Sequence, residues 1–419
     1  MSPSTRLTAG TGSSAIVERC QICDIAELDP VLFLGFLPPV NQMWPVGRTP
    51  GEQPAYPALL LRCRKCQLVQ LGLVVDPQIL FPPEYPYSSG TTKILRENFA
   101  ELCREAAPRL GLKPGDLVVD VGSNDGTLLS SFQQAGFRVH GIEPTQMGVV
   151  AQSRGIPTTI SFLNADAADR VRREQGPAQL VTATNVFAHI EDVHAVVQNI
   201  RRLLADDGTF ISESHYLLSL VETLQYDTIY HEHLRYYSLT SVQHLLEQHG
   251  LEVFFAKRIA THGGSIRIYA APKGVRPVDP AIAEIRRQET ALSAEALREF
   301  KRRVVASKLA LYGLLQQIKA AGQRIYGIGA PSRASTLINY VGLDDGILDC
   351  VLEIKGSQKI GKYMPGTLIP VVDESRLFDD PPDYALLLSW HIADELIGKL
   401  RSKGYRGRFL IPLPDPRVV

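Results

Sequence analysis

The sequence predicts an α/β protein with three parts: a small N-terminal domain that bears cysteines, a central parallel sheet that ends in an antiparallel hairpin, and a smaller C-terminal α/β domain. Two CxxC pairs mark the first part. In the second part, strand-like runs alternate with helix-length segments, which is the rhythm of a parallel sheet. A new strand, glycine turn and helix open the third part. We place the three domains at residues 1–75, 76–272 and 273–419.

Length and charge narrow the function classes. The 419 residues are enough for several domains, and 45% hydrophobic with 21% charged residues is ordinary for a globular protein. Lys plus Arg equals Asp plus Glu at 44 each, so charge gives no reason to expect a nucleic-acid or membrane partner. The first twenty residues lack an apolar core, and the apolar run near residues 31–47 contains prolines. We expect a cytoplasmic monomer.

The cysteines of the first domain predict a metal site. Cys20 and Cys23 form one CxxC pair, and Cys63 and Cys66 form another after 39 intervening residues. Four thiolates suit a tetrahedral Zn²⁺ and leave no position for a water molecule, so the ion would be structural. Unrelated thiols or a redox pair are the alternative interpretation.

The central domain begins with a Val-rich strand and a glycine turn in residues 114–126. Strand candidates follow in residues 137–144, 178–190 and 208–216, and residues 251–259 and 265–271 predict the final hairpin around THGG. This ending suits the sheet of a class I methyltransferase better than that of a dinucleotide dehydrogenase.

The glycine turn predicts an adenosine-containing cofactor. Gly122 and Gly126 allow close backbone approach, and Glu143 ends the next strand, where a carboxylate can accept hydrogen bonds from a ribose diol. Asp120 and Asp125 would repel a pyrophosphate but suit the cationic amino acid of S-adenosylmethionine. A plain α/β turn is the alternative. The expected cofactor-binding residues are Asp120, Gly122, Asn124, Asp125, Gly126, Glu143, Pro144 and Asn185.

A row of proton carriers, YHEH, follows the strand candidate of residues 208–216. It comprises Tyr230, His231, Glu232 and His233, and it lacks the HExxH spacing of zinc proteases. From the residues alone, a catalytic cluster and a hydrogen-bonded structural cluster both stay open. His189, at the end of the strand candidate of residues 178–190, is a further site residue, although a lone histidine is often a satisfied core group.

With these motifs assembled, the chain resembles the nucleotide-sugar C-methyltransferases, which include the dTDP-sugar 3-C-methyltransferases of deoxysugar pathways. The resemblance covers nearly the whole chain. It rests on the two CxxC pairs and, in the family's order, on VGSNDGTLL, IEP, NVFAHI, YHEHLRYYS, THGGSIRIY, YGIGAPSRASTLIN, KYMPGTLIP and SWHIADE.

The resemblance implies a zinc-binding domain, a Rossmann-like S-adenosylmethionine domain and a C-terminal Rossmann-like domain, with a nucleotide-linked 4-keto-6-deoxyhexose as substrate and carbon 3 as the methylated atom. It places His233 as the favoured base, with Tyr230 and Glu232 beside it and His189 in the active site. A tyrosine in YPYSSG, either Tyr85 or Tyr87, should face the sugar. The residues expected at the substrate are His262, Gly327, Gly329, Ala330, Arg333, Glu353, Lys362, Trp390 and His391.

Three positions in the C-terminal domain depart from the family pattern. Arg333 stands where Lys is common, Glu353 where Asp usually begins the motif, and His391 where Asn is frequent. The glycine turn of Gly327 and Gly329, with Arg333, could hold a diphosphate, or it could be a structural turn with a surface Arg. These departures bear on the nucleotide and sugar preference rather than on methyl transfer.

The chemistry explains why such residues are needed. A carbon next to a ketone becomes nucleophilic when a base removes its proton, and a hydrogen-bond donor stabilises the enolate oxygen. His233 would be the base, Glu232 its partner and Tyr230 the donor, with His189 or the Tyr85/Tyr87 pair as alternative donors. Competing interpretations are a zinc-ribbon nucleic-acid methyltransferase, a non-catalytic protein that binds S-adenosylmethionine, and an oxidoreductase with two Rossmann units.

Overall fold

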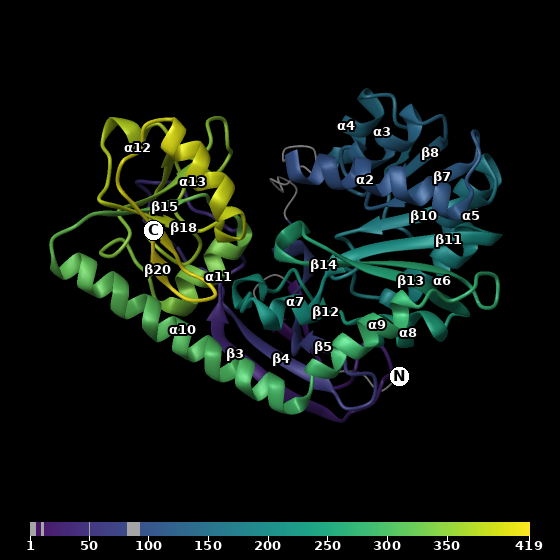
Figure 1. The fold of residues 1–419 in the computed structure, drawn as a ribbon, viewed down its shortest axis with the longest axis horizontal. Helices are drawn as coiled ribbons and strands as arrows, with labels where there is room; N and C mark the ends of the chain where they lie inside the picture. Colours follow the sequence, from purple (N-terminus) through teal and green to yellow (C-terminus); the bar gives the residue numbers. More distant parts are fainter. Residues whose placement is uncertain (1–5, 10–11, 50, 82–92) are drawn as a thin grey trace.

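The computed structural model describes residues 6–9, 12–49, 51–81 and 93–419 and arranges them in four sheets with surrounding helices (Figure 1). Tyr85 and Tyr87 lie outside the described residues. Two α/β lobes stand side by side, and the strands β3 and β4 run beneath them (Figure 1). Within the described part of the chain, no helix has the length and apolar character needed to cross a bilayer.

The N-terminal residues form two antiparallel sheets. The smaller sheet has the order β1-β2-β6, and its strands are Arg6–Ala9, Gly12–Ile16 and Leu73–Val74. The larger sheet has the order β12-β5-β4-β3, and its strands are Arg235–Tyr236, Val69–Leu71, Tyr56–Cys63 and Leu28–Leu37. The edge strand β12 comes from the central part of the chain, directly after YHEH. The short helix α1 (Pro77–Leu80) follows the smaller sheet.

The central sheet has seven strands in the order β13-β14-β11-β10-β7-β8-β9. Five are parallel: β7 Leu117–Val121, β8 Arg138–Ile142, β9 Thr158–Thr159, β10 Ala178–Thr184 and β11 Leu204–His215. β14 (Ser265–Pro272) pairs antiparallel with both β11 and β13 (Leu251–Ile259). The predicted class I methyltransferase sheet with its closing hairpin is therefore confirmed.

Helices cover both faces of this sheet. Phe132 and Leu102 pack on one face, and Val171 and Val197 on the other. Burial on both faces explains why β7 is apolar throughout except for Asp120. The helices are α2 Lys93–Leu110, α3 Thr127–Gln134, α4 Gln146–Ser153, α5 Ala165–Gln175, α6 Val193–Leu203, α7 Leu217–Glu222 and α8 Leu239–Glu247, with 3-10 turns η2 Tyr226–Thr228 and η3 Thr261–Gly263.

The helical stretch of residues 279–322 is interrupted. It divides into α9 (Ala281–Gln288), the 3-10 turn η4 (Glu289–Ala291) and α10 (Ala294–Ala320), which Ser293 caps. The break lies where buried Glu289 accepts hydrogen bonds from the Leu239 amide and the Tyr216 hydroxyl, at 2.5 and 2.9 Å. A carboxylate at the start of α8 is favourable, because the first amides of a helix lack partners.

The C-terminal sheet has six strands in the order β17-β16-β15-β18-β19-β20, and only the last pairing is antiparallel. The strands are β15 Ile325–Ile328, β16 Cys350–Glu353, β17 Val371–Asp373, β18 Tyr384–Leu387, β19 Arg408–Ile411 and β20 Arg417–Val418. The helices are α11 Ser332–Val341, α12 Arg376–Asp379 and α13 Ala393–Ser402, with the turn η5 Trp390–Ile392. This is the expected second α/β unit.

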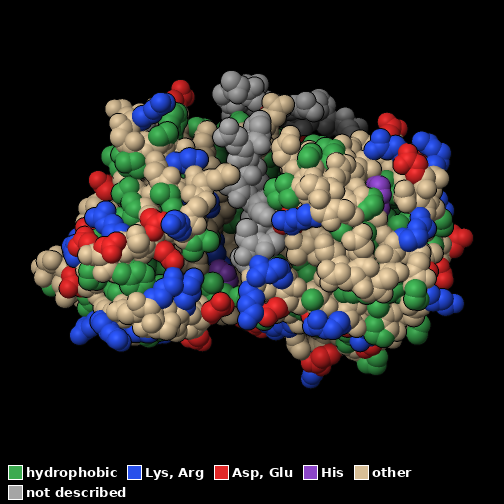
Figure 2. All heavy atoms as spheres, turned by 90° about the horizontal axis from the view of Figure 1, so that it is seen from above, with side chains coloured by type: hydrophobic (Ala, Val, Ile, Leu, Met, Phe, Trp, Pro, Cys, Tyr) green, Lys and Arg blue, Asp and Glu red, His purple; other side chains and the backbone are tan. Residues whose placement is uncertain are grey.

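Charges of both signs are scattered over the face drawn in Figure 2. Blue and red side chains alternate over both lobes there, as the zero net charge leads one to expect.

Candidate active site and metal centre

The turn after β7 is open because its backbone adopts left-handed angles. Gly122 has φ of 70° and Gly126 has φ of 76°, a region that glycine enters without strain. A Cβ on Gly122 would lie 2.5 Å from the Val186 side chain, closer than real Cβ atoms come. Backbone angle and close packing therefore both require glycine at Gly122, and the strand–glycine turn–helix path is one that nucleotide-type cofactor sites use.

Two buried acids stand beside this turn. Glu143, at the end of β8, accepts hydrogen bonds from the Asn124 amide (3.0 Å) and the Thr145 amide (2.9 Å). Asp120 accepts one from Thr182 Oγ1 at 2.6 Å. Burial raises the pKa of Asp120 to about 7, with the charges of Glu143 and Glu213 adding to the effect and the Thr182 hydrogen bond opposing it. A bound cation would favour the ionised form of Asp120.

Asp125 is occupied by local partners. Its carboxylate accepts a hydrogen bond from Thr127 Oγ1 at 2.6 Å and lies 3.1 Å from Arg154 Nη1. The charge expected to face the cofactor is thus balanced by Arg154 and held at the start of α3. Asn185, with φ of 57°, donates its amide to the Glu213 carbonyl at 2.8 Å and begins the turn after β10. Pro144 follows Glu143 and is half-buried.

The YHEH segment links η2 to β12 and is buried throughout. His233 Nδ1 lies 2.8 Å from the Thr228 carbonyl oxygen, which can only accept, so Nδ1 carries the proton and Nε2 keeps its lone pair. Burial, with His189 and His262 nearby, holds the pKa of His233 well below its usual value. This arrangement presents a neutral imidazole whose Nε2 is free of the proton.

The other three members of the row differ in their surroundings. The Tyr230 ring stacks on the His233 ring with centroids 4.1 Å apart. Glu232 accepts a hydrogen bond from Asn41 Nδ2 at 2.8 Å. His231, for which the sequence suggested no role, turns to the N-terminal sheet, where its Nε2 donates to the Pro57 carbonyl at 3.3 Å. His231 therefore anchors the segment on β4.

Four imidazoles gather where β10, β11 and η3 end. The rings of His189 and His215 lie 5.0 and 4.8 Å from the ring of His233, and His262 lies 5.4 Å from His215. Burial lowers the pKa of His189 and of His262 to about 4 each. His262 has φ of 56°, and its buried Nε2 has no hydrogen-bond partner among the described residues. A buried orphan nitrogen is a position for a polar ligand atom.

Two hydrogen bonds to backbone carbonyls hold the turn of His189 against the chain that follows YHEH. The Leu234 amide donates to the Ala188 carbonyl at 2.8 Å, and buried Arg235 donates to the Glu191 carbonyl at 2.6 Å. The turn after β10 and the chain after YHEH are therefore held together on both sides of His189.

The second glycine turn, after β15, is held by the carboxylate of Glu353 at the end of β16. The Ala330 amide donates to Glu353 Oε2 at 3.0 Å, and Lys359 Nζ donates to the Ala330 carbonyl at 2.6 Å. Gly329 has φ of 82°, and a Cβ on Gly327 would meet Leu388 at 2.8 Å. Lys362 is half-buried on the neighbouring loop. The ammonium group of half-buried Lys359 thus stands at this turn, which suits an anionic ligand.

Arg333 is engaged inside the protein rather than displayed at the surface. Its Nε and Nη2 lie 2.8 Å from the two carboxylate oxygens of Asp227 in η2. Trp390 Nε1 donates to the same carboxylate at 2.7 Å. His391 is half-buried, and burial with nearby Arg333 lowers its pKa to about 3. The diphosphate contact suggested for Arg333 from the sequence would compete with this ion pair.

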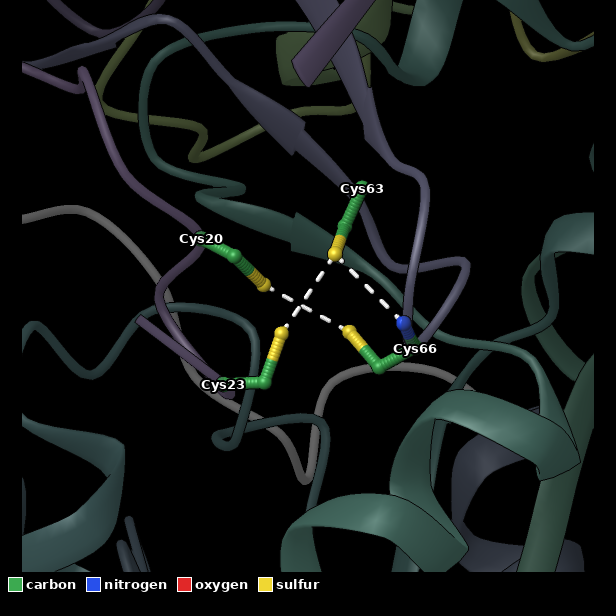
Figure 3. A group of neighbouring side chains, drawn as sticks. All are labelled: Cys20, Cys23, Cys63 and Cys66. Atoms are coloured by element: carbon green, nitrogen blue, oxygen red, sulfur yellow. Dashed lines mark hydrogen bonds between the residues drawn. The ribbon is translucent and has the colours of Figure 1, made fainter. Parts of the chain in front are cut away.

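The four cysteines of the CxxC pairs meet, as Figure 3 shows, with their sulfur atoms turned to a common centre. Cys20 Sγ lies 3.4 Å from Cys66 Sγ, Cys23 Sγ lies 3.4 Å from Cys63 Sγ, and all four lie within 4.8 Å of one another. Tetrahedral zinc with bonds of about 2.3 Å needs sulfur atoms about 3.8 Å apart. The set fits a structural Zn²⁺ with no ligand position left open.

Three residues of this region were missed by sequence reasoning: His215, Asn41 and Asp227. His215 had a detectable signal, since it ends a strand of the parallel sheet, as His189 nearly does. Asn41 and Asp227 had none, because their partners Glu232 and Arg333 lie more than 100 residues away in the chain.

Three family models match the chain in succession. They are "Putative zinc binding domain" over residues 20–81, "Methyltransferase domain" over residues 94–254 and "C-methyltransferase C-terminal domain" over residues 260–414. A curated relative, C-methyltransferase NovU of Streptomyces niveus, is 34% identical over 409 residues, which cover 96% of this chain and 97% of that protein.

Solved structures are similar to less than half of the chain. Magnesium protoporphyrin IX methyltransferase from Synechocystis PCC 6803 with bound SAM is 18% identical, covers 44% of this chain and 86% of its own, and has a TM-score of 0.33. A S-adenosylmethionine-dependent methyltransferase from Clostridium acetobutylicum is 12% identical, covers 43% and 92%, and also has a TM-score of 0.33.

Proposed function

The chain belongs to the family of S-adenosylmethionine-dependent C-methyltransferases, and from this premise we propose that it methylates carbon 3 of a nucleotide-linked 4-keto-6-deoxyhexose. The observation that carries the proposal is the hydrogen bond from His233 Nδ1 to the Thr228 carbonyl. It leaves Nε2 as a proton acceptor in a cluster of imidazoles at the carboxyl ends of β10 and β11, on the edge of the sheet where the cofactor turn lies.

Carbon methylation needs a base of this kind. The hydrogen on a carbon next to a ketone is removed by His233 Nε2, and the electron pair moves into an enolate. Tyr230, which stacks on His233, and His189, on its other side, are the donors to the enolate oxygen. S-adenosylmethionine, when bound, supplies the methyl group on a sulfonium that the enolate carbon attacks. One proton is released for each methyl group transferred.

The pKa of His233 suits this task. Because burial holds it well below its usual value, the imidazole is neutral over the whole physiological range. Activity should therefore show no loss from His233 protonation between about pH 6 and 8. Glu232, held by Asn41, keeps the segment in place beside the imidazole cluster.

The cofactor would lie along the β7 turn, and the substrate at the second glycine turn. Glu143 would accept the ribose hydroxyls, and Asp120 would face the cationic amino acid. In the C-terminal domain, Lys362 and the Gly327–Gly329 turn would take the diphosphate, with His262 at the sugar. Asp120 and Glu143 stand at the first turn, whereas at the second turn the lysine Lys359 accompanies Glu353, so the second turn is the less acidic of the two.

The test is a direct one. Purified protein is incubated with S-adenosylmethionine and with dTDP-, GDP- and CDP-linked 4-keto-6-deoxyhexoses, and the products are analysed by mass spectrometry and NMR. We expect one methyl group on carbon 3 for one of the nucleotide classes. His233→Gln should keep cofactor affinity and lose about 100-fold to 10,000-fold in turnover. Transfer to no keto-sugar of the panel, or full turnover by His233→Gln, would contradict the proposal.

A further inference from the structure

Helix α11 of the C-terminal domain grips the segment that carries the catalytic candidates. Arg333 pairs with Asp227, Thr336 Oγ1 donates to the Ile229 carbonyl at 3.3 Å, and Ser332 Oγ lies 3.3 Å from Asn41 Oδ1. Since residues at spacings of three and four share a helix face, one face of α11 makes these contacts.

The Arg333–Asp227 pair is the strongest of these contacts. Both Arg333 contacts are 2.8 Å long, and the pairing is bidentate. The Asp227 side chain is 0% exposed and that of Arg333 is 7% exposed. Trp390 adds a third hydrogen bond to the carboxylate at 2.7 Å, and its ring lies 5.0 Å from the guanidinium carbon. A buried pair with this many partners has one geometry, because breaking it leaves a buried charge alone.

This pair lies next to the group that sets the proton position on the candidate base. Asp227 and Thr228 are adjacent, and the Thr228 carbonyl accepts the proton of His233 Nδ1. Holding the Asp227 side chain therefore limits movement of the next peptide. Thr336 limits movement of the Ile229 carbonyl on its other side. The peptide that orients the imidazole is thus held from both sides by α11.

We propose that Arg333 and Asp227 are positioning residues that hold the Thr228 carbonyl, and so keep His233 in the tautomer with Nε2 unprotonated. Because the glycine turn of Gly327 and Gly329 ends where α11 begins, binding of an anionic substrate at that turn and the readiness of the base are linked through one rigid helix. This inference rests on the proposed function, since it assigns His233 as the base. It also assigns Arg333 to Asp227 rather than to the substrate.

The experiment separates positioning from substrate binding. The variants are Arg333→Gln, Asp227→Asn and the double variant, which removes both charges together and so leaves no lone buried ion. We measure kcat, KM for the sugar nucleotide, cofactor affinity, and the exchange of the substrate carbon-bound hydrogen in D₂O without cofactor. We expect kcat and exchange to fall about 100-fold, with KM and cofactor affinity changed less than about threefold.

A spectroscopic measurement adds a readout that general destabilisation does not move. In ¹⁵N-histidine NMR, the wild-type His233 signal, assigned by its loss in His233→Gln, should show protonated Nδ1 and unprotonated Nε2. The double variant should show a mixture of both tautomers. Arg324→Gln is the matched control, since Arg324 pairs with Asp380 at 2.7 Å in the same domain but is half-exposed. That variant should leave kcat and the tautomer unchanged.

The outcomes are distinguishable. A rise in KM with kcat unchanged would make Arg333 a substrate ligand and overturn the inference while leaving the proposed function in place. An unchanged tautomer and unchanged exchange in the double variant would also overturn it. Absence of methyl transfer by the wild-type protein would instead overturn the proposed function.

Discussion

Two strand–turn–helix units in this chain begin alike and end differently. In the first, β7 leads to a glycine turn and α3, and Glu143 accepts the Asn124 amide at 3.0 Å. In the second, β15 leads to a glycine turn and α11, and Glu353 accepts the Ala330 amide at 3.0 Å. The acid that ends the following strand therefore fixes the turn in the same way in both units.

The difference lies in the charged residue near the start of each helix. In the first unit, Asp125 is balanced by Arg154 of the same domain, so the unit is complete in itself. In the second, Arg333 reaches Asp227 of another domain. The same local pattern can therefore be complete within its own domain or be joined to another domain, and the partners of the helix decide which.

Removal of zinc should have the largest effect on methyl transfer. It should disturb the contacts of the second unit and leave those of the first unit in place. Structural zinc contributes about 10 kcal/mol or more to small domains, so Cys63→Ser should unfold the N-terminal sheets. Asn41 and the pairing partner of β12 would then be lost, while the first unit keeps its own contacts. We expect methyl transfer to disappear and cofactor affinity to stay within about tenfold of wild type, measured by calorimetry.

The control for that variant is Cys103→Ser, which changes a buried cysteine outside the cluster. Full turnover by a zinc-free Cys63→Ser protein would contradict the dependence of the second unit on the N-terminal sheet.

Asp120 should give the first unit a pH dependence that the second lacks, because Gly327 holds the equivalent position. The pKa of Asp120 is raised from 3.8 to about 7 in the folded state. The folded protein therefore holds this proton more tightly, and stability is lost as pH rises from about 4 through 7, by up to about 4 kcal/mol. Urea titrations from pH 5 to 8 should show that slope in the wild type and a smaller one in Asp120→Asn.

Affinity for the cofactor should change with pH in the direction opposite to the change in stability. A cation favours ionised Asp120, so affinity for S-adenosylmethionine should rise as pH increases through about 7. Affinity that does not vary with pH in the wild type would remove Asp120 from the cofactor site.

Replacing Glu143 in one variant and Glu353 in another tests whether the two units bind different ligands. Glu143→Gln should weaken S-adenosylmethionine binding by about 10-fold to 100-fold, since a hydrogen bond to a charged group contributes about 1.5–3 kcal/mol. Glu353→Gln, the matched change in the second unit, should leave that affinity unchanged and alter KM for the sugar nucleotide. Equal losses of cofactor affinity in both variants would show that the assignment of ligands to the two turns is wrong.

Arg154→Gln should have the smallest effect. Asp125 is buried, but the Arg154 side chain is 50% exposed and Thr127 keeps its hydrogen bond to the Asp125 carboxylate, so the pair contributes only about 1 kcal/mol. Thermal unfolding should shift slightly, and kcat should not change. A large loss of kcat would mean that the Asp125 pair acts on the chemistry, as we propose for the buried Arg333 pair.

The architecture could be predicted because its signals are local. Val-rich runs, glycine turns and the THGG hairpin each lie within one short window, and these windows contain six of the seven strands of the central sheet, while the two-residue β9 gave no such signal. The CxxC spacing in the same way predicted the cluster of four sulfur atoms. The break of the helical stretch at Glu289 could not be predicted, because the partners of this carboxylate lie about 50 residues away.

The candidate site was less predictable because its contacts cross domains. The sequence shows YHEH as four adjacent residues that can carry or hold a proton. It does not show which residue contacts each of the four. The Thr228 carbonyl, Asn41 and Pro57 each contact one of them, and no periodicity marks these partners. The ion pair of Arg333 was hidden for the same reason: its sequence context also fitted a diphosphate-binding turn.

The two-residue strand β12 has a consequence for protein engineering. Because Arg235 and Tyr236 pair with Gln70 and Val69, the polypeptide just after YHEH is a strand of the cysteine-bearing module. Chimeras that exchange domains between relatives at residue 75 would join an N-terminal sheet and an edge strand that were not selected together. Exchanges that transfer residues 225–237 along with the N-terminal module would keep the parental pairing, and such crossovers should give active hybrids more often.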